Sequence, residues 1–251
     1  MINVYEPAIG KEEIKFVLNA VKSGELSGTF GKYIENFEKE FANYSGCKYG
    51  VAVSSGTTAL HLAVSAAGIK KGDEVLLSSS TNIATALSIV HNGGIPVPVD
   101  CEEETWNLDV SLLENLITKK TKAIIPVHLF GHPVDMRALM KIAKKYKLKV
   151  IEDCAESHGA SYKKKMTGSF GDMGCYSFYA NKIITTGEGG MVVTNNKSLY
   201  RKLKLLRNLA FEQPRFKHKY LGFNFRMTGY QAAMGLAQTR KLDKIIKQKR
   251  R

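Results

Sequence analysis

The chain has 251 residues, 44% of them hydrophobic and 24% charged, and carries a formal net charge of +14 at pH 7. This hydrophobic content supports a packed core in a chain long enough for one large domain or two small ones. No stretch approaches the ~20 uninterrupted apolar residues of a membrane helix, and the N-terminal residues lack the apolar core of a signal peptide. We therefore expect a cytoplasmic protein that does not span a membrane.

The positive charge admits a nucleic-acid partner, because a basic surface attracts phosphates whatever the fold. Much of the excess, however, lies on predicted helix faces around Lys141 to Lys149 and in the C-terminal stretch TRKLDKIIKQKRR. Solvated helix faces are the favoured interpretation, with a site for a phosphorylated small substrate as the alternative, and no nucleic-acid partner is expected.

The cysteines give no sign of a disulfide framework or a metal cluster. They are widely spaced, with no CxxC pair, at Cys47, Cys101, Cys154 and Cys175. We expect buried free thiols and no metal site.

Along the chain, short apolar runs alternate with amphipathic stretches. The runs predict strands at 49–55, 74–80, 95–100, 122–130, 149–154, 174–179 and 190–195. Stretches such as 57–68 and 134–147 have helical spacing. This alternation predicts an α/β domain with a mainly parallel seven-stranded sheet between helices. A last helical pattern runs from about Thr228 to Arg251 without a glycine or proline stop, so we expect the chain to end within an element.

The first predicted strand is followed by SSGTTALHL. Small residues before a helix leave free N–H groups at its positive end, where Gly56, Thr57 and Thr58 could hold a phosphate. Ordinary helix capping is the alternative.

A second strand ends in VIEDCAESHG, with carboxylates at Glu152, Asp153 and Glu156. An acid at the edge of a buried parallel sheet needs a cation or strong donors. A protonated ring nitrogen, a metal ion or a structural salt bridge would each serve.

Lys182 follows a third strand and precedes the glycine-rich stretch TTGEGG. Partial desolvation there would favour the neutral, nucleophilic amine that a Schiff-base lysine needs, although a lysine at a strand edge is more often a surface charge. TTGEGG matches neither a Walker loop nor a GxGxxG fingerprint, so nucleotide hydrolysis and dinucleotide binding find no support. Taken together, the phosphate cradle, the aspartate and the lysine are the three anchors that pyridoxal 5'-phosphate (PLP) requires.

The chain resembles the DegT/DnrJ/EryC1/StrS family of PLP-dependent sugar aminotransferases. The similarity is collinear through segments that include GKYIENFEKEFANYSGCKYGVAVSSGTTALHLA, GDEVLLSSSTNIATA, KAIIPVHLFGHPVDM, GSFGDMGCYSFYANKIITTGEGGMVVTN and GFNFRMTGYQAAMGLAQ. The resemblance implies a fold-type I large domain. The pieces RNLAF, EDCAE and NKIITTGEGGMV are most similar to the branch whose members aminate a GDP-linked 4-keto-6-deoxymannose.

The resemblance also implies roles for individual residues. Lys182 would form the Schiff base with the cofactor and act as general base and acid, and Asp153 would pair with the pyridinium nitrogen. Glu156 would lie near the ring hydroxyl, where many relatives have glutamine. The phosphate would be bound by Gly56, Thr57, Thr58 and Ser177. Asn224 would reach the phosphate from the other subunit, which implies a homodimer.

The implied reaction is a ping-pong transfer of an amino group from L-glutamate to a nucleotide-linked keto sugar, in the synthesis of O-antigen or another surface polysaccharide. Lys182 stands where the relative that removes a sugar hydroxyl has histidine, which argues against that reaction.

Two departures from the family pattern bear on this expectation. Asn82 stands where many relatives place an aromatic residue that stacks on the cofactor ring. Relatives also continue past LAQTRKLDKIIKQKRR into a smaller C-terminal domain. We therefore expect residues 1–251 to be the large domain, truncated before the small one. An impaired remnant, or one half of a split enzyme with a binding or regulatory role, is the alternative.

Overall fold

The computed structural model describes residues 6–214, 216 and 218–250. Its helices are α1 (Lys11–Lys22), α2 (Lys32–Tyr44), α3 (Gly56–Ala67), α4 (Ile83–Val90), α5 (Leu113–Leu116), α6 (Met136–Tyr146), α7 (Lys197–Arg207), α8 (Gly229–Arg240) and α9 (Leu242–Lys249). The long strands are β1 (Tyr49–Val53), β2 (Glu74–Ser78), β3 (Ile95–Val99), β4 (Thr121–Ile125), β5 (Lys149–Asp153), β8 (Met173–Ser177) and β9 (Gly190–Thr194). All seven predicted strands are confirmed, and so are both predicted helices.

The long strands form one sheet in the order β1-β9-β8-β5-β4-β2-β3. Neighbours pair in parallel from β8 to β3, whereas β9 runs antiparallel to both β1 and β8. The prediction of a mainly parallel sheet is therefore confirmed. Because β8 and β9 are antiparallel neighbours, the loop between them, which carries Lys182, turns back at the carboxyl end of β8.

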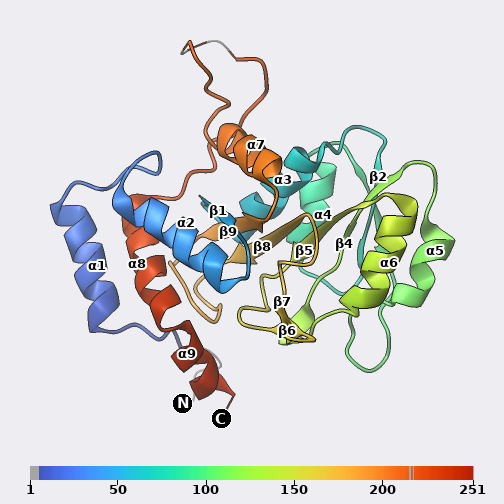
Figure 1. Ribbon diagram of the computed structural model, residues 1–251, viewed down its shortest axis with the longest axis horizontal. Helices are drawn as coiled ribbons and strands as arrows, with labels where there is room; N and C mark the ends of the chain where they lie inside the picture. The colour runs from blue at the N-terminus through green and yellow to red at the C-terminus, as the bar shows by residue number, and fades with distance from the viewer. Residues whose placement is uncertain (1–5, 215, 217, 251) are drawn as a thin grey trace.

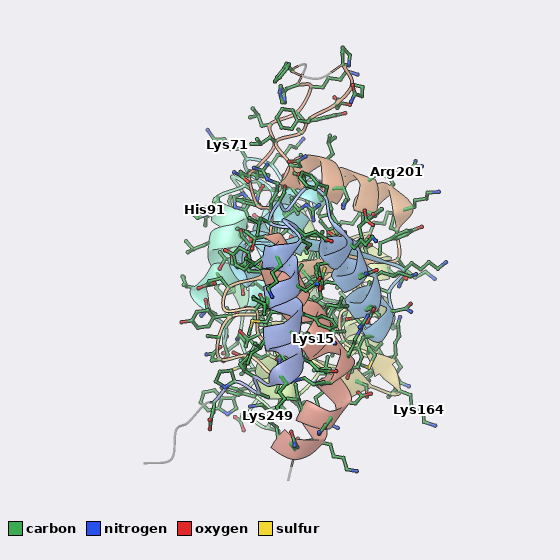
Figure 2. The ribbon with its side chains drawn as sticks, turned by 90° about the vertical axis from the view of Figure 1, so that its left-hand side faces the viewer. Lys15, Lys71, His91, Lys164, Arg201 and Lys249 are labelled. Atoms are coloured by element: carbon green, nitrogen blue, oxygen red, sulfur yellow. The ribbon has the colours of Figure 1, made fainter. Side chains whose placement is uncertain are left out.

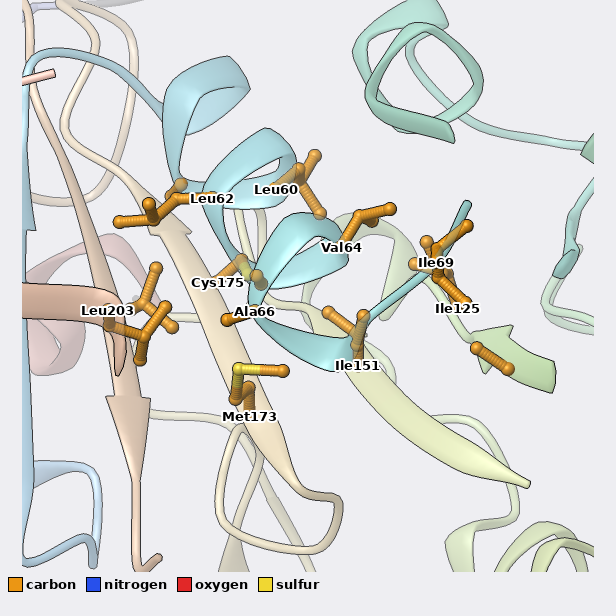
Figure 3. Close-up of a cluster of buried hydrophobic side chains, with 14 of the residues drawn as sticks. Leu60, Leu62, Val64, Ala66, Ile69, Ile125, Ile151, Met173, Cys175 and Leu203 are labelled. Carbon is orange, nitrogen blue, oxygen red and sulfur yellow. The ribbon is translucent and has the colours of Figure 1, made fainter. Parts of the chain in front are cut away.

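Helices cover both faces of the sheet (Figure 1). On one face, α3 packs with α4 and α7 over alternate residues of the strands, as Figure 3 shows around Leu60, Val64 and Ile151. On the other face, α2, α8 and α9 cover β1, β9 and β8, while α5 and α6 cover the β4–β3 side. Within β1, Val51 and Val53 face the α3 layer and Ala52 faces the α2 layer, as expected for strands buried on both sides.

The structure adds detail that the sequence patterns did not predict. A short hairpin, β6 (Ser161–Tyr162) and β7 (Lys165–Met166), lies outside the main sheet. The predicted last helix is divided at Lys241, which ends α8 and begins α9 with a φ of −107° and a ψ of 3°. The expectation for the chain end at Arg251 lies outside the described residues.

Basic side chains lie on several elements of the surface. Figure 2 shows Lys15 on α1, Arg201 on α7, Lys249 on α9, and Lys71 and Lys164 on turns. The solvated-face interpretation of the positive charge stays a prediction. None of the described helices is long and apolar enough to cross a membrane. The four cysteines are free thiols; three of them are buried and Cys101 is half-buried.

Candidate active site

A cavity of about 260 Å³ opens at the carboxyl ends of the parallel strands. Its walls come from the segments that follow β1, β2, β4, β5 and β8 and from the β8–β9 loop. Six of the predicted site residues line it, namely Gly56, Thr57, Asp153, Glu156, Ser177 and Lys182. In open α/β sheets this edge is where ligands bind, so the fold and the predicted residues indicate the same place.

The N-terminus of α3 forms one wall. The Ser55 hydroxyl accepts a hydrogen bond from the Thr58 amide at 3.1 Å, and the Thr58 hydroxyl accepts one from the Ser55 amide at 2.9 Å, a capping box that starts the helix at Gly56. No acceptor for the amides of Gly56 and Thr57 lies among the described residues. These two amides are therefore free to bind an anion at the positive end of the helix.

Gly56 allows α3 to approach β8 closely. A Cβ at this position would lie 2.6 Å from the Cβ and 3.0 Å from the Oγ of Ser177, closer than real Cβ atoms tolerate. The glycine thus brings the Ser177 hydroxyl next to the free amides and forms an anion cradle with a hydroxyl donor. A phosphate group would fit this cradle chemically.

Asp153 ends β5 and is 4% exposed. One carboxylate oxygen accepts a hydrogen bond from the Ala155 amide at 3.1 Å and the other accepts one from the Thr85 hydroxyl at 2.9 Å. Burial raises the pKa of Asp153, and the hydrogen bonds from Ala155 and Thr85 and the charge of Lys182 oppose this shift. A cation brought into the cavity would stabilise the ionised form.

One threonine, Thr85, binds the Asp153 carboxylate, and a second, Thr81, contacts Thr85. The Thr85 and Thr81 hydroxyl oxygens are 2.8 Å apart. When Asp153 is ionised, Thr85 must use its single proton to reach the carboxylate, so Thr81 donates to Thr85. Thr81 lines the cavity, and the chain of hydroxyl groups therefore runs from the cavity wall to the aspartate.

Lys182 lies opposite, in the β8–β9 loop. Its Nζ is 3.9 Å from Oε1 of Glu156, and the two side chains are 19% and 31% exposed. The other Glu156 oxygen accepts a hydrogen bond from the Phe130 amide at 3.0 Å, which fixes the carboxylate. Burial and the charge of Lys182 lower the pKa of the buried His158 to about 3, so that imidazole stays neutral.

Glu152, the neighbour of Asp153, points away from the cavity. It is surrounded by four hydrogen-bond donors, the amides of Gly168, Phe170 and Gly171 and the ring of His128, here termed the hub. One oxygen accepts hydrogen bonds from the Phe170 and Gly171 amides at 2.8 and 2.7 Å, and the other accepts from the Gly168 amide at 2.8 Å and from Nε2 of His128 at 3.1 Å. Potential ligand atoms of His128, Glu152 and Cys154 lie within 4.8 Å of one another. The carboxylate oxygens are already occupied by four donors, so this group is explained by hydrogen bonding. A ring nitrogen, a metal ion and a structural partner were the alternatives for the strand-end acids, and for Glu152 the structure shows structural partners.

Two predicted residues lie in the described part of the chain but outside the cavity wall. Thr58 contributes to the cap of α3, and its hydroxyl donates to the Ser55 carbonyl at 2.9 Å. Asn224 is exposed and forms a β-bridge with Asn208 at the base of a long loop. Their roles as phosphate ligands stay predictions. Asn82 lines the cavity and caps α4, with its side-chain oxygen 3.0 Å from the Ala84 amide.

Several residues of the site were not singled out from the sequence: Thr81, Tyr179, Asn181 and Glu188 line the cavity, and Thr85 binds the Asp153 carboxylate. Thr85 had a usable signal, because it is a fully buried polar residue within the apolar helix IATALSIV. The others lie in loops, where sequence patterns carry little positional information.

The free amides beside Ser177, the buried acid Asp153 and the amine of Lys182 suit the three functional groups of PLP: a phosphate, a basic ring nitrogen and an aldehyde. A side chain at Gly56 would collide with Ser177, the hydroxyl donor of the cradle. The residues present therefore fit this cofactor.

Comparison with known proteins gives a consistent result. Residues 7–251 match the model of the DegT/DnrJ/EryC1/StrS aminotransferase family. The chain is 46% identical over 250 residues to GDP-perosamine synthase of Escherichia coli O157:H7, covering 99% of this chain and 68% of the relative. It is 47% identical over 246 residues to GDP-perosamine synthase of Caulobacter vibrioides, covering 98% of this chain and 66% of the relative.

A solved structure, the putative sugar aminotransferase Spr1654 from Streptococcus pneumoniae in its PMP form, matches with a TM-score of 0.91 and 28% identity. The match covers 97% of this chain and 66% of that one. The chain thus spans about two thirds of the length of the relatives it matches.

Proposed function

The chain belongs to the DegT/DnrJ/EryC1/StrS aminotransferase family, whose members depend on PLP, and from this premise we propose that residues 1–251 form the cofactor-binding large domain of a sugar-nucleotide aminotransferase. The observation that carries the proposal is the single cavity in which the α3 amides, Ser177, Asp153 and Lys182 converge. Bound there, PLP would supply the electron sink that lets an amino group be taken up and passed on.

The protein's own residues would divide the work as follows. The Gly56 and Thr57 amides and the Ser177 hydroxyl would bind the phosphate, and Asp153 would pair with a protonated ring nitrogen, which would offset the cost of burying its carboxylate. Lys182 would hold the cofactor through its amine and would serve as general base and acid for the proton at the reacting carbon.

Glu156 would support the lysine from one side of the cavity. Its carboxylate lies 3.9 Å from the Lys182 amine, within the distance of an ion pair, and its other oxygen is held by the Phe130 amide.

We propose L-glutamate as the amino donor and GDP-4-keto-6-deoxymannose as the acceptor. The reaction would take place in the cytoplasm and give GDP-perosamine, a precursor of a surface polysaccharide. The support is the identity of 46% and 47% to relatives named GDP-perosamine synthase. Asn224 would serve the phosphate of a second copy in a homodimer, since it lies outside the cavity of its own chain. The comparisons lend no support to the alternative of an impaired remnant.

An absorption spectrum tests the proposal. The purified chain with added PLP should develop a Schiff-base band that Lys182→Ala abolishes and that the exposed control Lys141→Ala retains. L-Glutamate should then convert the band to that of the aminated cofactor, and GDP-4-keto-6-deoxymannose should restore it. A band that forms equally well in Lys182→Ala would refute the assignment of the lysine.

A further inference from the structure

Helix α8 presents two glutamine side chains to the loop of residues 178–189, here termed the lysine loop because it carries Lys182. The Gln231 side-chain amide donates to the Glu188 carbonyl at 2.8 Å, and the Gln238 side-chain oxygen accepts from the Thr185 amide at 3.3 Å. Positions seven apart lie on the same face of a helix. The helix therefore holds the lysine loop at two points that both follow Lys182.

The lysine loop is closed by bonds of its own. The Phe178 carbonyl accepts from the Thr185 hydroxyl and from the Thr186 amide, each at 3.0 Å, and the Phe178 amide donates to the Gly189 carbonyl at 2.8 Å. These bonds shape the loop, but all of them run within it. Thr185 is three residues from Lys182, so its hydrogen bond to Gln238 joins the part of the loop next to the lysine to α8.

The orientation of the Gln238 amide is fixed by its other partners. The side chain is fully buried, and its two N–H groups donate to the Ala8 carbonyl at 2.8 Å and to Oε1 of Glu13 at 2.9 Å. Both partners are acceptors, so the amide nitrogen must face them and the oxygen must face the Thr185 amide. No other side chain of this size offers two donors and one acceptor in this arrangement.

Glu13 makes this orientation permanent. Its carboxylate also accepts from the Gly10 amide at 2.8 Å and forms an ion pair with Lys241. Burial alone would raise the pKa of Glu13, but the hydrogen bonds from Lys241, Gln238 and Gly10 outweigh it and hold the pKa below its ordinary value. An ionised Glu13 cannot donate, so the Gln238 amide has no alternative orientation. Because α1 packs against α8 (Figures 1 and 2), the buried chain of bonds joins the first helix to the lysine loop.

We propose that Gln238 is a positioning residue for Lys182, holding the lysine loop through Thr185 so that the amine enters the cavity, with Gln231 supporting the loop at Glu188. The inference deepens the proposed function and rests on it, because it concerns the reach of Lys182 toward the cofactor.

Hydrogen exchange of the cofactor-free protein gives a test that is independent of the cofactor. Gln238→Met keeps the size of the side chain and removes its hydrogen bonds, and the exposed Gln248→Met on α9 is the matched control. Exchange in the lysine loop should accelerate about tenfold in Gln238→Met, the equivalent of one hydrogen bond, with β8 and β9 unchanged. Unchanged exchange in the lysine loop would overturn the inference. If Gln238→Met does not fold, Gln231→Met tests the second attachment of the loop to α8, at Glu188, and should also accelerate exchange in the lysine loop.

Covalent attachment of PLP gives the second test. Borohydride reduction followed by mass spectrometry measures how fast Lys182 captures PLP, and dialysis measures total binding. In Gln238→Met the rate of capture should fall about tenfold while phosphate-dependent binding persists, because the cradle is intact. Capture at the wild-type rate in a folded variant would overturn the inference. Failure of the wild type to capture PLP at Lys182 would instead refute the proposed function and leave hydrogen exchange to decide the inference.

Discussion

Replacing Glu152 with glutamine changes a single atom group in the hub beside the cavity, yet we expect a large loss of stability. In the wild type each carboxylate oxygen accepts two donors: one oxygen receives the Phe170 and Gly171 amides and the other receives the Gly168 amide and His128. Glutamine has one oxygen and one NH2 group. Whichever way the amide turns, its NH2 group faces two donors.

The magnitude follows from counting the donors that lose their acceptor. A buried donor without an acceptor costs about 1–3 kcal/mol, so two of them predict a loss of about 2–6 kcal/mol in the free energy of unfolding. His128 offers no escape by changing its tautomer, because its Nδ1 already accepts the Val134 amide at 3.2 Å. If the proton moved to Nδ1, Nε2 could accept from the glutamine amide, but the Val134 amide would lose its acceptor.

Urea denaturation followed by circular dichroism measures this change. Glu114→Gln is the control, because Glu114 pairs with Lys145 at the surface, where solvent screens the pair and its loss should leave the stability nearly unchanged. A loss below about 1 kcal/mol for Glu152→Gln would refute the reasoning and would show that the hub relaxes around the amide. A loss within the expected range would establish that Glu152 supports the strand end that carries Asp153.

Two further predictions concern the cavity itself. Gly56→Ala should weaken PLP binding by about tenfold or more, because the added Cβ would lie 2.6 Å from that of Ser177 and would push α3 away from β8. Fluorescence titration measures the affinity for PLP, and Gly10→Ala is the control. An unchanged affinity would contradict the role of Gly56 in the anion cradle. In the cofactor-free protein, burial raises the pKa of Asp153 above its ordinary value of 3.8, so its contribution to stability is complete below that value and is lost as pH rises through the folded-state pKa. The free energy of unfolding of the wild type, measured relative to that of Asp153→Asn by urea denaturation, should therefore fall as pH rises from about 4 to 8. A difference that stays constant or rises with pH would contradict a raised pKa of Asp153.

The sequence by itself determined the strands and the strand-end groups. Continuous apolar runs can be buried only in a sheet covered on both faces, which is why all seven strands were predicted. Parallel strands bring their carboxyl ends to one edge, which is why Gly56, Asp153 and Lys182 could be grouped before their positions were known. The resemblance to a known family added their expected roles.

Only the tertiary structure decided which side chains meet. Glu152 and Asp153 are adjacent acids with similar sequence signals, yet one enters a hub of backbone amides and the other enters the cavity. Successive strand residues face opposite sides, and which side holds the cavity depends on partners distant in sequence, such as Thr85 and the 168–171 turn. The two glutamines of α8 likewise contact the lysine loop only in the folded chain. A side-chain amide is defined by its donors and acceptors, and these come together only when the chain has folded.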